Sequence, residues 1–266
     1  MTGHLKLVCS ADALGRSHLS EQSFCAPFHL SKPFEEAGVL VVNVVNPTAG
    51  VFGGDELASE IRVETGAKLL VTSPSATRVH QQTNRGARQI QKYEVRTGGF
   101  LDIWPELFIP QAGAVYEQHT CIEVDQGGAL IFSETLAPGR VASGEVFEFE
   151  RLDWKTEISF EGTSVVRERY TLRPDDDSLG ALKSIYPAAY YGCCFAIGEI
   201  FAAATVPDSF CQLTEGVLAG ASKLVDRGWV IKVIARGSVE LRKFMILVRR
   251  RLYETVGYEM PALRRF

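Results

Sequence analysis

Charged and hydroxyl side chains occur in four short clusters of the chain, each flanked by glycine, proline or other small residues. The clusters are Gly53-Gly54-Asp55, residues 72–80 with Thr77 and His80, residues 104–110 with Glu106, and residues 138–145 with Glu145. Carboxylates could do paired acid–base chemistry of the glycosidase type, but the sequence alone selects no pair. The alternative is turn chemistry at strand ends, which favours the same residue types.

Common catalytic and nucleotide-binding motifs are missing from the sequence. There is no G-x-x-x-x-G-K-[ST] loop, and Val51-Phe52-Gly53-Gly54-Asp55 lacks the lysine of one, so nucleotide binding is not expected. The chain also has no G-x-S-x-G and no H-E-x-x-H motif. Its five histidines show no helical spacing, so a dedicated His/Cys metal cage is not predicted. The sequence therefore does not predict an enzyme.

Composition and cysteine usage point to a reduced, compactly folded protein. Hydrophobic residues make up 46% and charged residues 23%, and the net charge is −4, so neither disorder nor binding to nucleic acid or an anionic membrane is expected. The six cysteines form no C-x-x-C pair, and no secretory or membrane-spanning segment is evident. We therefore expect free thiols and a cytoplasmic location. For Cys193-Cys194, buried small hydrophobes are favoured over a soft-metal site.

The elements that must position the clusters come from an internal repeat. Residues 61–71, 93–103 and 122–132 share the pattern apolar-x-Val-x-x-Gly-small-x-Leu-x-apolar, and a looser copy surrounds Gly38. Each copy predicts a strand, a tight turn and a second strand, and such a unit must stack on its neighbours to bury its apolar face. Equivalent interior positions are expected for Val63, Val95 and Val124, and for Leu69, Leu101 and Leu130. Three unrelated hairpins are the alternative.

After Pro138 the pattern changes. Residues 145–172 predict two long strands that turn at residues 161–163. Residues 212–226 predict a helix and residues 229–235 a strand. A second helix is expected from residue 238 onward, with Arg249-Arg250-Arg251 on its solvated face. The expected fold class is mainly β, with stacked β-solenoid-like or layered sheets and a few helices in the C-terminal third. We expect one domain over 1–266, strand-rich over 1–175 and mixed α/β over 176–266. An exposed apolar patch for a partner is expected from seven residues: Ile185, Tyr186, Tyr190, Tyr191, Phe195, Ile200 and Phe201.

Taken in order, the clusters resemble the UreD (also called UreH) family of urease accessory proteins. The resemblance runs from Gln22 to Leu172. It is carried by Ala26-Pro27-Phe28, Lys32-Pro33-Phe34, residues 46–55, Gly66-Ala67, residues 72–77, Trp104-Pro105-Glu106, Gly139-Arg140, Ala142-Ser143-Gly144-Glu145 and Arg167-Glu168-Arg169.

The resemblance implies a non-catalytic role in urease maturation. Members form a cytoplasmic complex with a helical UreF-type protein and a UreG-type GTPase, which docks on the urease structural subunits and delivers nickel. It also implies a polar internal passage for the metal and no permanently bound cofactor. Two other functions remain open at this point: a β-solenoid enzyme acting on carbohydrate, and a purely structural interaction module.

Nickel in transit needs weak, exchangeable oxygen or imidazole ligands, because a complete cage would trap it. The candidate residues for a transient Ni²⁺ passage are Asp55, Thr77, His80, Glu106, Glu145 and Glu168. Each can equally be a structural hydrogen-bonding residue. Glu145 is the first choice, because small residues precede it and a long strand is expected to begin there. Alternation along a strand should turn Arg167 and Arg169 away from Glu168.

Overall fold

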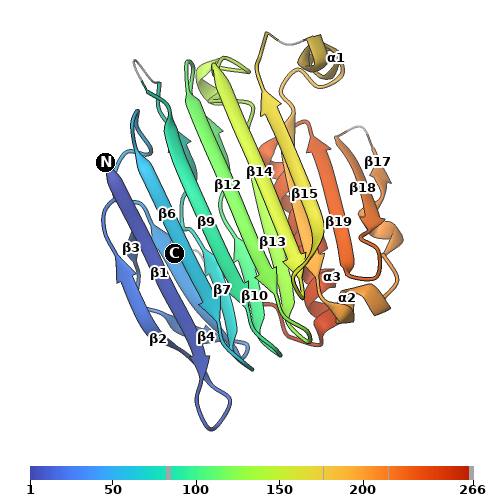
Figure 1. The fold of residues 1–266 in the computed structure, drawn as a ribbon. Coiled ribbons are helices and arrows are strands. Elements are labelled where there is room, and N and C mark those ends of the chain that lie inside the picture. Colours follow the sequence, from blue (N-terminus) through green and yellow to red (C-terminus); the bar gives the residue numbers. More distant parts are fainter. Residues whose placement is uncertain (82–84, 176, 215, 264–266) are drawn as a thin grey trace.

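Two stacked β-sheets form most of the molecule in a computed structural model, which describes residues 1–81, 85–175, 177–214 and 216–263 (Figure 1). Sheet I has the strand order β15-β14-β12-β9-β6-β1-β2, and the main path of sheet II is β17-β18-β19-β16-β13-β10-β7-β5-β3. The strands of sheet I are β1 (Thr2–Ala11), β2 (Ser17–Phe24), β6 (Glu56–Val63), β9 (Ala87–Val95), β12 (Val115–Val124), β14 (Arg151–Phe160) and β15 (Thr163–Leu172). Those of sheet II are β3 (His29–Leu30), β4 (Phe34–Glu36), β5 (Val39–Val45), β7 (Lys68–Thr72), β8 (Thr77–Val79), β10 (Phe100–Trp104), β11 (Phe108–Pro110), β13 (Ala129–Leu136), β16 (Tyr190–Ile197), β17 (Gln212–Leu213), β18 (Val217–Lys223) and β19 (Gly228–Ala235).

The repeat builds a two-sided solenoid, as the sequence predicts. Val63 pairs with Val95 and Val95 with Val124 in the parallel ladders of sheet I. Leu69, Leu101 and Leu130 pair in the same way in sheet II. The two strands of one copy do not pair with each other, because each turn carries the chain from sheet I to sheet II. The hairpin alternative is therefore wrong for these three copies. In the looser copy around Gly38 only the second strand follows the repeat: Leu40 stacks on Leu69, but β4 and β5 pair antiparallel with each other within sheet II.

Three turns at one end of the stack require glycine. Gly66, Gly98 and Gly127 have φ values of +71°, +69° and +73°, in the left-handed region that other residues disfavour. Each lies at the point where the chain leaves sheet I for sheet II. The shared glycine of the sequence pattern therefore sets the corner of each of these three coils.

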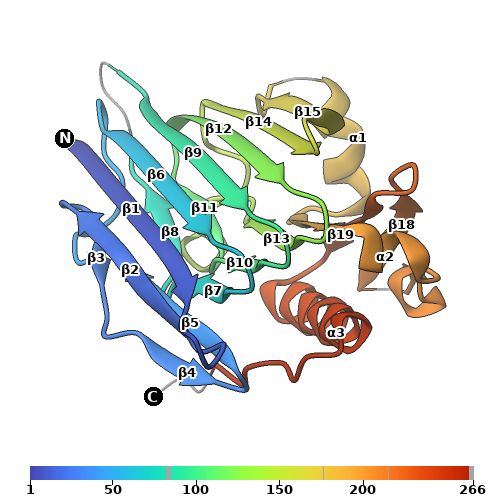
Figure 2. The ribbon, with the colours of Figure 1, turned by 60° about the horizontal axis from the view of Figure 1, so that its bottom comes forward.

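Helices α2 (Glu199–Ala203) and α3 (Ser238–Val256) cover the outer face of sheet II, whereas α1 (Asp177–Ile185) lies beyond the end of β14 and β15 (Figure 2). Short 3₁₀ turns lie at Val141–Ser143 and Asp208–Phe210. Leu241, Met245 and Val248 of α3 pack against Ile231 and Val233 of sheet II. Since the inner face of sheet II packs on sheet I, its central strands are buried on both faces, as in β10.

Antiparallel strands close both ends of sheet I. The parallel run from β1 to β14 is flanked by β2 at one edge and β15 at the other, and both pair antiparallel with their neighbours. A reversed strand breaks the parallel register on which a further coil would have to stack. The reversed strands therefore end the solenoid, whose repeat could otherwise continue.

Several expectations for the C-terminal third are wrong. In place of the helix expected over residues 212–226, the structure has β17 and β18, because Gly216 and Gly220 disfavour a helix and all of β18 pairs with residues 229–235 of β19. The strand expected to begin at Glu145 begins at Arg151. Arg249 is 3% exposed instead of solvated, whereas Arg250 and Arg251 are exposed as expected.

The expected apolar patch is also wrong for most of its members. Tyr186, Tyr190, Phe195 and Phe201 are buried, and Tyr191 is partly buried. Only Ile185 and Ile200 are exposed, at 65% and 43%. The aromatic residues fill the spaces between sheet II, its helices and sheet I, so this segment is core and not an interface.

All six cysteines are free thiols, and Cys193 and Cys194 are buried as expected. Within the described residues, no helix combines the length and apolar character needed to cross a membrane.

Candidate functional site

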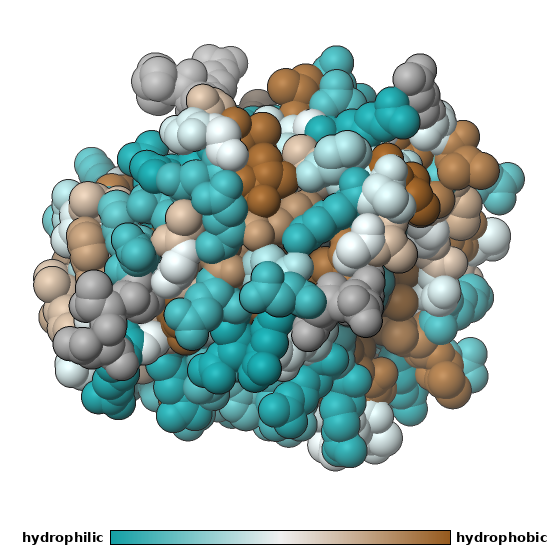
Figure 3. Space-filling view, turned by 90° about the horizontal axis from the view of Figure 1, so that it is seen from above, coloured by the Kyte–Doolittle hydropathy of each residue, from teal (hydrophilic) through white to brown (hydrophobic). Residues whose placement is uncertain are grey.

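A cavity of about 340 Å³ lies between the two sheets, toward the end of the molecule where β7 and β10 finish. Residues at that end, Ser73, Thr77 and Glu106 among them, line it together with inward-facing side chains of sheet I. Figure 3 looks onto this end and shows hydrophobic residues exposed between hydrophilic ones. The cavity therefore connects two of the clusters singled out in the sequence, residues 72–80 and 104–110, with the interior of the sandwich.

A row of polar side chains crosses the inner face of sheet I. The parallel and antiparallel registers align Ser59 of β6, Gln91 of β9, Thr120 of β12, Thr156 of β14 and Glu168 of β15. Ser59, Thr120 and Thr156 are at most 4% exposed. Strand alternation aims all five at sheet II, so the solenoid places polar groups where apolar ones would ordinarily pack.

Gln89 of β9 and Gln118 of β12 pair to form a second polar row beside the first. A hydrogen bond from Gln118 to Thr120 joins the two rows. The Tyr116 hydroxyl donates to Gln89 Oε1 at 2.7 Å and Thr120 Oγ1 donates to Gln91 Oε1 at 2.8 Å. Gln118 Nε2 lies 3.3 Å from Thr120 Oγ1. These contacts satisfy buried polar groups that would otherwise be costly, and they make a continuous polar lining.

Glu134 is the carboxylate at the centre of this lining. It extends from β13 of sheet II, is 9% exposed, and its Oε1 accepts hydrogen bonds from Gln118 Nε2 at 2.8 Å and Trp154 Nε1 at 2.6 Å. Burial raises the pKa of Glu134 to about 7, against the lowering effect of the Trp154 hydrogen bond and with a further rise from the charge of Glu168. Its charge can therefore change near neutral pH.

The free energy of unfolding should depend on pH because Glu134 titrates. A raised native pKa favours folding below the unfolded-state pKa, and that stabilisation is lost as the pH rises through the native value, here from about 4.5 to about 7. The variant Glu134→Gln keeps an acceptor for Trp154 but cannot titrate. The free energy of unfolding of the wild type, relative to that of this variant, should therefore fall by about 3 kcal/mol as the pH rises through this window. Urea unfolding at both ends measures the difference. Parallel pH dependence of the two proteins would contradict it, and exposed Glu123→Gln controls for a charge change alone.

Glu168 lies at the β15 edge of the same interior. Its Oε1 accepts from Lys232 Nζ at 2.5 Å, an ion pair that joins β15 of sheet I to β19 of sheet II. The stacked rings of Trp154 and Tyr170, with centroids 6.2 Å apart, stand beside it. Arg167 and Arg169 are exposed on the opposite face, as alternation predicts.

Thr77 and Glu106 line the cavity itself. The Thr77 amide donates to the Leu107 carbonyl, and the Glu106 amide donates to Ser73 Oγ at 2.9 Å, which fixes the two loops against each other. Glu106 also lines a neighbouring cavity beside α3, where its Oε2 lies 3.7 Å from Arg242 Nη1. Glu106 therefore stands between the interior and a groove on the surface.

The other four candidate residues, Glu168 among them, do not line the cavity. Asp55 is 5% exposed, and its carboxylate pairs with the Met1 amino group at 2.8 Å and accepts from the Phe52 amide at 2.8 Å. His80 stacks on Phe52, with ring centroids 4.4 Å apart. Glu145 lies in a loop, where it pairs with Arg140 through both its oxygens and accepts from the Ala112 amide, contacts that lower its pKa.

The sequence interpretation missed Glu134, although a signal for it exists. Leu130, Phe132 and Glu134 alternate along β13, so the residue after two core positions had to point inward as well. The partners on sheet I could not be found in this way, because their meeting depends on the distance and register between two sheets.

Comparison with known proteins identifies the family of the chain. The family model described as "UreD urease accessory protein" matches residues 1–266. A urease accessory protein UreD of Opitutus terrae is 38% identical over 261 residues, covering 95% of this chain and 94% of the relative. One from Acetivibrio thermocellus is 30% identical over 248 residues, covering 90% and 93%, and one from Yersinia pseudotuberculosis is 30% identical over 278 residues, covering 98% and 84%. The chain therefore belongs to the UreD family of urease accessory proteins.

Proposed function

We propose that this chain is a non-catalytic metallochaperone and adaptor for nickel insertion into apo-urease. It acts in the cytoplasm with a helical UreF-type protein, a UreG-type GTPase and the urease structural subunits. Membership in the urease accessory family supports the role, and six free thiols support a reducing compartment. The observation that carries the metal-transfer part is the polar lining around Glu134.

The lining has the chemistry of a route and not of a storage site. Amide, hydroxyl and carboxylate oxygens are exchangeable ligands for a divalent cation, and no cage of several thiolates or imidazoles lines the cavity among the described residues. Glu134 can hold a positive ion when it is ionised, and it is protonated and becomes neutral as the pH falls through its pKa of about 7. A purely structural module would gain stability from apolar side chains at these positions. The presence of polar side chains there therefore favours a passage for the metal.

We infer that the chain acts as one domain over residues 1–266. Cys193 and Phe195, from the C-terminal part, pack in the same core cluster as Val63 and Val95 of the repeat. The boundary near residue 175 is therefore a change in secondary structure within one core.

Co-expression tests the proposal. A tagged chain should co-purify with the two accessory partners and with urease subunits, and Glu134→Gln should keep those partners while lowering the nickel content per urease active site. The matched control is Glu123→Gln, on the outer face of the neighbouring strand β12, which should leave nickel content unchanged. Normal nickel loading with Glu134→Gln would remove this residue from the route. Failure to capture either partner or urease would overturn the adaptor role.

The same assay ranks the sequence candidates. Thr77→Ala and Glu106→Gln alter the cavity lining, whereas Glu145→Ala alters a loop outside it. We expect the first two to lower nickel content more than the third. The reverse order would place the route along the Arg140–Glu145 loop instead of the interior.

A further inference from the structure

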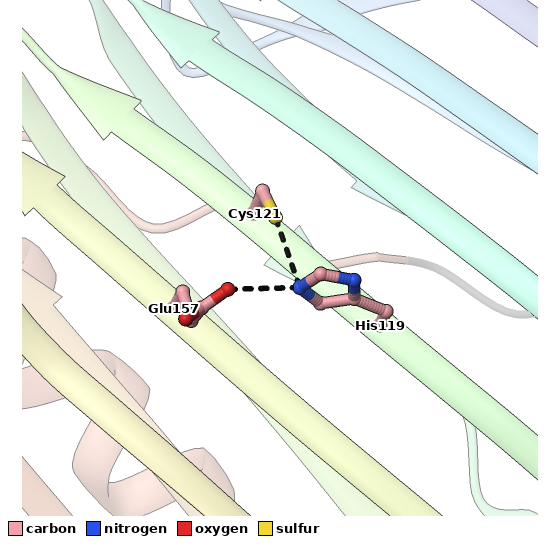
Figure 4. Close-up of side chains that lie close together, drawn as sticks. All are labelled: His119, Cys121 and Glu157. Carbon is pink, nitrogen blue, oxygen red and sulfur yellow. Dashed lines mark hydrogen bonds and ion pairs between the residues drawn. The ribbon is translucent and has the colours of Figure 1, made fainter.

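Three metal-ligating side chains meet on the outer face of sheet I (Figure 4). His119 and Cys121 are two residues apart on β12, so both point away from sheet II. Glu157 of β14 joins them because the parallel register sets it beside Cys121. Helical spacing between histidines, the criterion applied to the sequence, does not detect such a group, because on a strand the relevant spacing is two.

The three ligand atoms converge on one point. His119 Nε2 lies 2.9 Å from Glu157 Oε2 and 3.2 Å from Cys121 Sγ, and all ligand atoms lie within 4.8 Å of one another. A nucleophilic triad needs the thiol and the carboxylate on opposite nitrogens of the ring, so that the imidazole can pass a proton between them. Here both contact the same nitrogen, an arrangement suited to a shared ion.

We propose that His119, Cys121 and Glu157 bind a divalent transition-metal ion of the Zn²⁺ and Ni²⁺ type. One imidazole, one thiolate and one carboxylate are borderline ligands that this class accepts, and three protein ligands leave a position for water or an exchanging partner. Metal bonds of roughly 2.0–2.3 Å at tetrahedral angles place ligand atoms roughly 3.3–3.6 Å apart, so small side-chain shifts complete the geometry. The thiol proton is released to solvent on binding.

Neighbouring cations set the strength of the site. Lys155 Nζ lies 2.8 Å from Glu157 Oε2, and Arg167 Nε lies 3.8 Å from the other oxygen. The ion must displace the Lys155 contact, which weakens binding and makes the metal exchangeable. Removing this ammonium should therefore strengthen binding.

The site is separate from the interior polar rows. Thr120, between the two ligands on β12, points to the opposite face of the sheet and belongs to the first polar row. Variants of Glu134 and variants of the outer-face group therefore test two separate metal-binding proposals, and either proposal can be disproved without affecting the other.

Equilibrium dialysis of the full chain, without a histidine tag, against Zn²⁺ alone and against Ni²⁺ alone tests the proposal. Relative to wild type, His119→Gln and Cys121→Ser should each weaken one binding event by more than about tenfold, a loss at least as large as that caused by removing an orienting partner of a metal ligand. Lys155→Gln should tighten the same event. Circular dichroism of each variant verifies the fold, because these partly exposed positions lie outside the core.

Controls use histidine and cysteine residues elsewhere. Cys25 Sγ lies 3.1 Å from His4 Nδ1, which is a second His–Cys contact, and Cys211 is exposed. Cys25→Ser and Cys211→Ser should leave the event unchanged. The proposal is overturned if folded Cys121→Ser binds both metals like the wild type, or if Cys25→Ser alone abolishes the event.

Discussion

Arg249→Ala is expected to lower the free energy of unfolding by about 3–5 kcal/mol, the cost of leaving a buried charge without its partner. Arg249 Nε lies 2.8 Å from Asp102 Oδ2, and the two side chains are 3% and 0% exposed. The pair joins α3 to β10, and the Tyr253 hydroxyl also donates to Asp102 Oδ2 at 2.8 Å. Urea unfolding of the purified chain measures the change.

Two variants make this result specific. Arg250→Ala removes the next, exposed arginine of the same helix and should cost far less. Asp102→Ala should destabilise about as much as Arg249→Ala, and the double variant should cost less than the sum of the two, because the partners interact directly. Additive costs would show that the residues act independently.

Leu101→Ala is expected to cost about 2–5 kcal/mol of unfolding free energy. Leu101 is fully buried and pairs on one side with Leu69 and on the other with Leu130, so truncation opens a cavity in the middle of the solenoid. The neighbouring coils hold fixed backbone positions and can fill that space only in part. Chemical denaturation followed by intrinsic fluorescence measures the loss.

Leu213→Ala is the matched control, because this leucine is 84% exposed. The same substitution should change stability there by less than about 0.5 kcal/mol. If the two substitutions cost the same, stacked leucines would not be the source of the solenoid's stability.

The repeated coils could be predicted because their information is local. Val63 and Leu69 stand at fixed distances from Gly66, and the same spacing recurs around Gly98 and Gly127. A period of two identifies the buried face, and a repeat implies that equivalent residues stack. The pairing of Val63 with Val95 therefore followed from the pattern without knowledge of the loops.

Features that depend on distant partners were not predictable in this way. The segment around Val217 has helix-compatible apolar spacing, but pairing with β19 decides its conformation. Arg249 stands in a run of three arginines, and only the approach of Asp102 from β10 shows which of them is buried. Glu134 likewise acquires its environment from Gln118 and Trp154 of the facing sheet.

The polar row from Ser59 to Glu168 runs across the strands and not along them. Neighbouring strands lie about 4.8 Å apart, so the row extends roughly 19 Å over its five strands. Because each strand contributes one residue, the length of the row is set by the number of neighbouring strands in sheet I. Inserting one further copy of about 30 residues would extend the row by roughly 5 Å, whereas lengthening any strand would leave its reach unchanged.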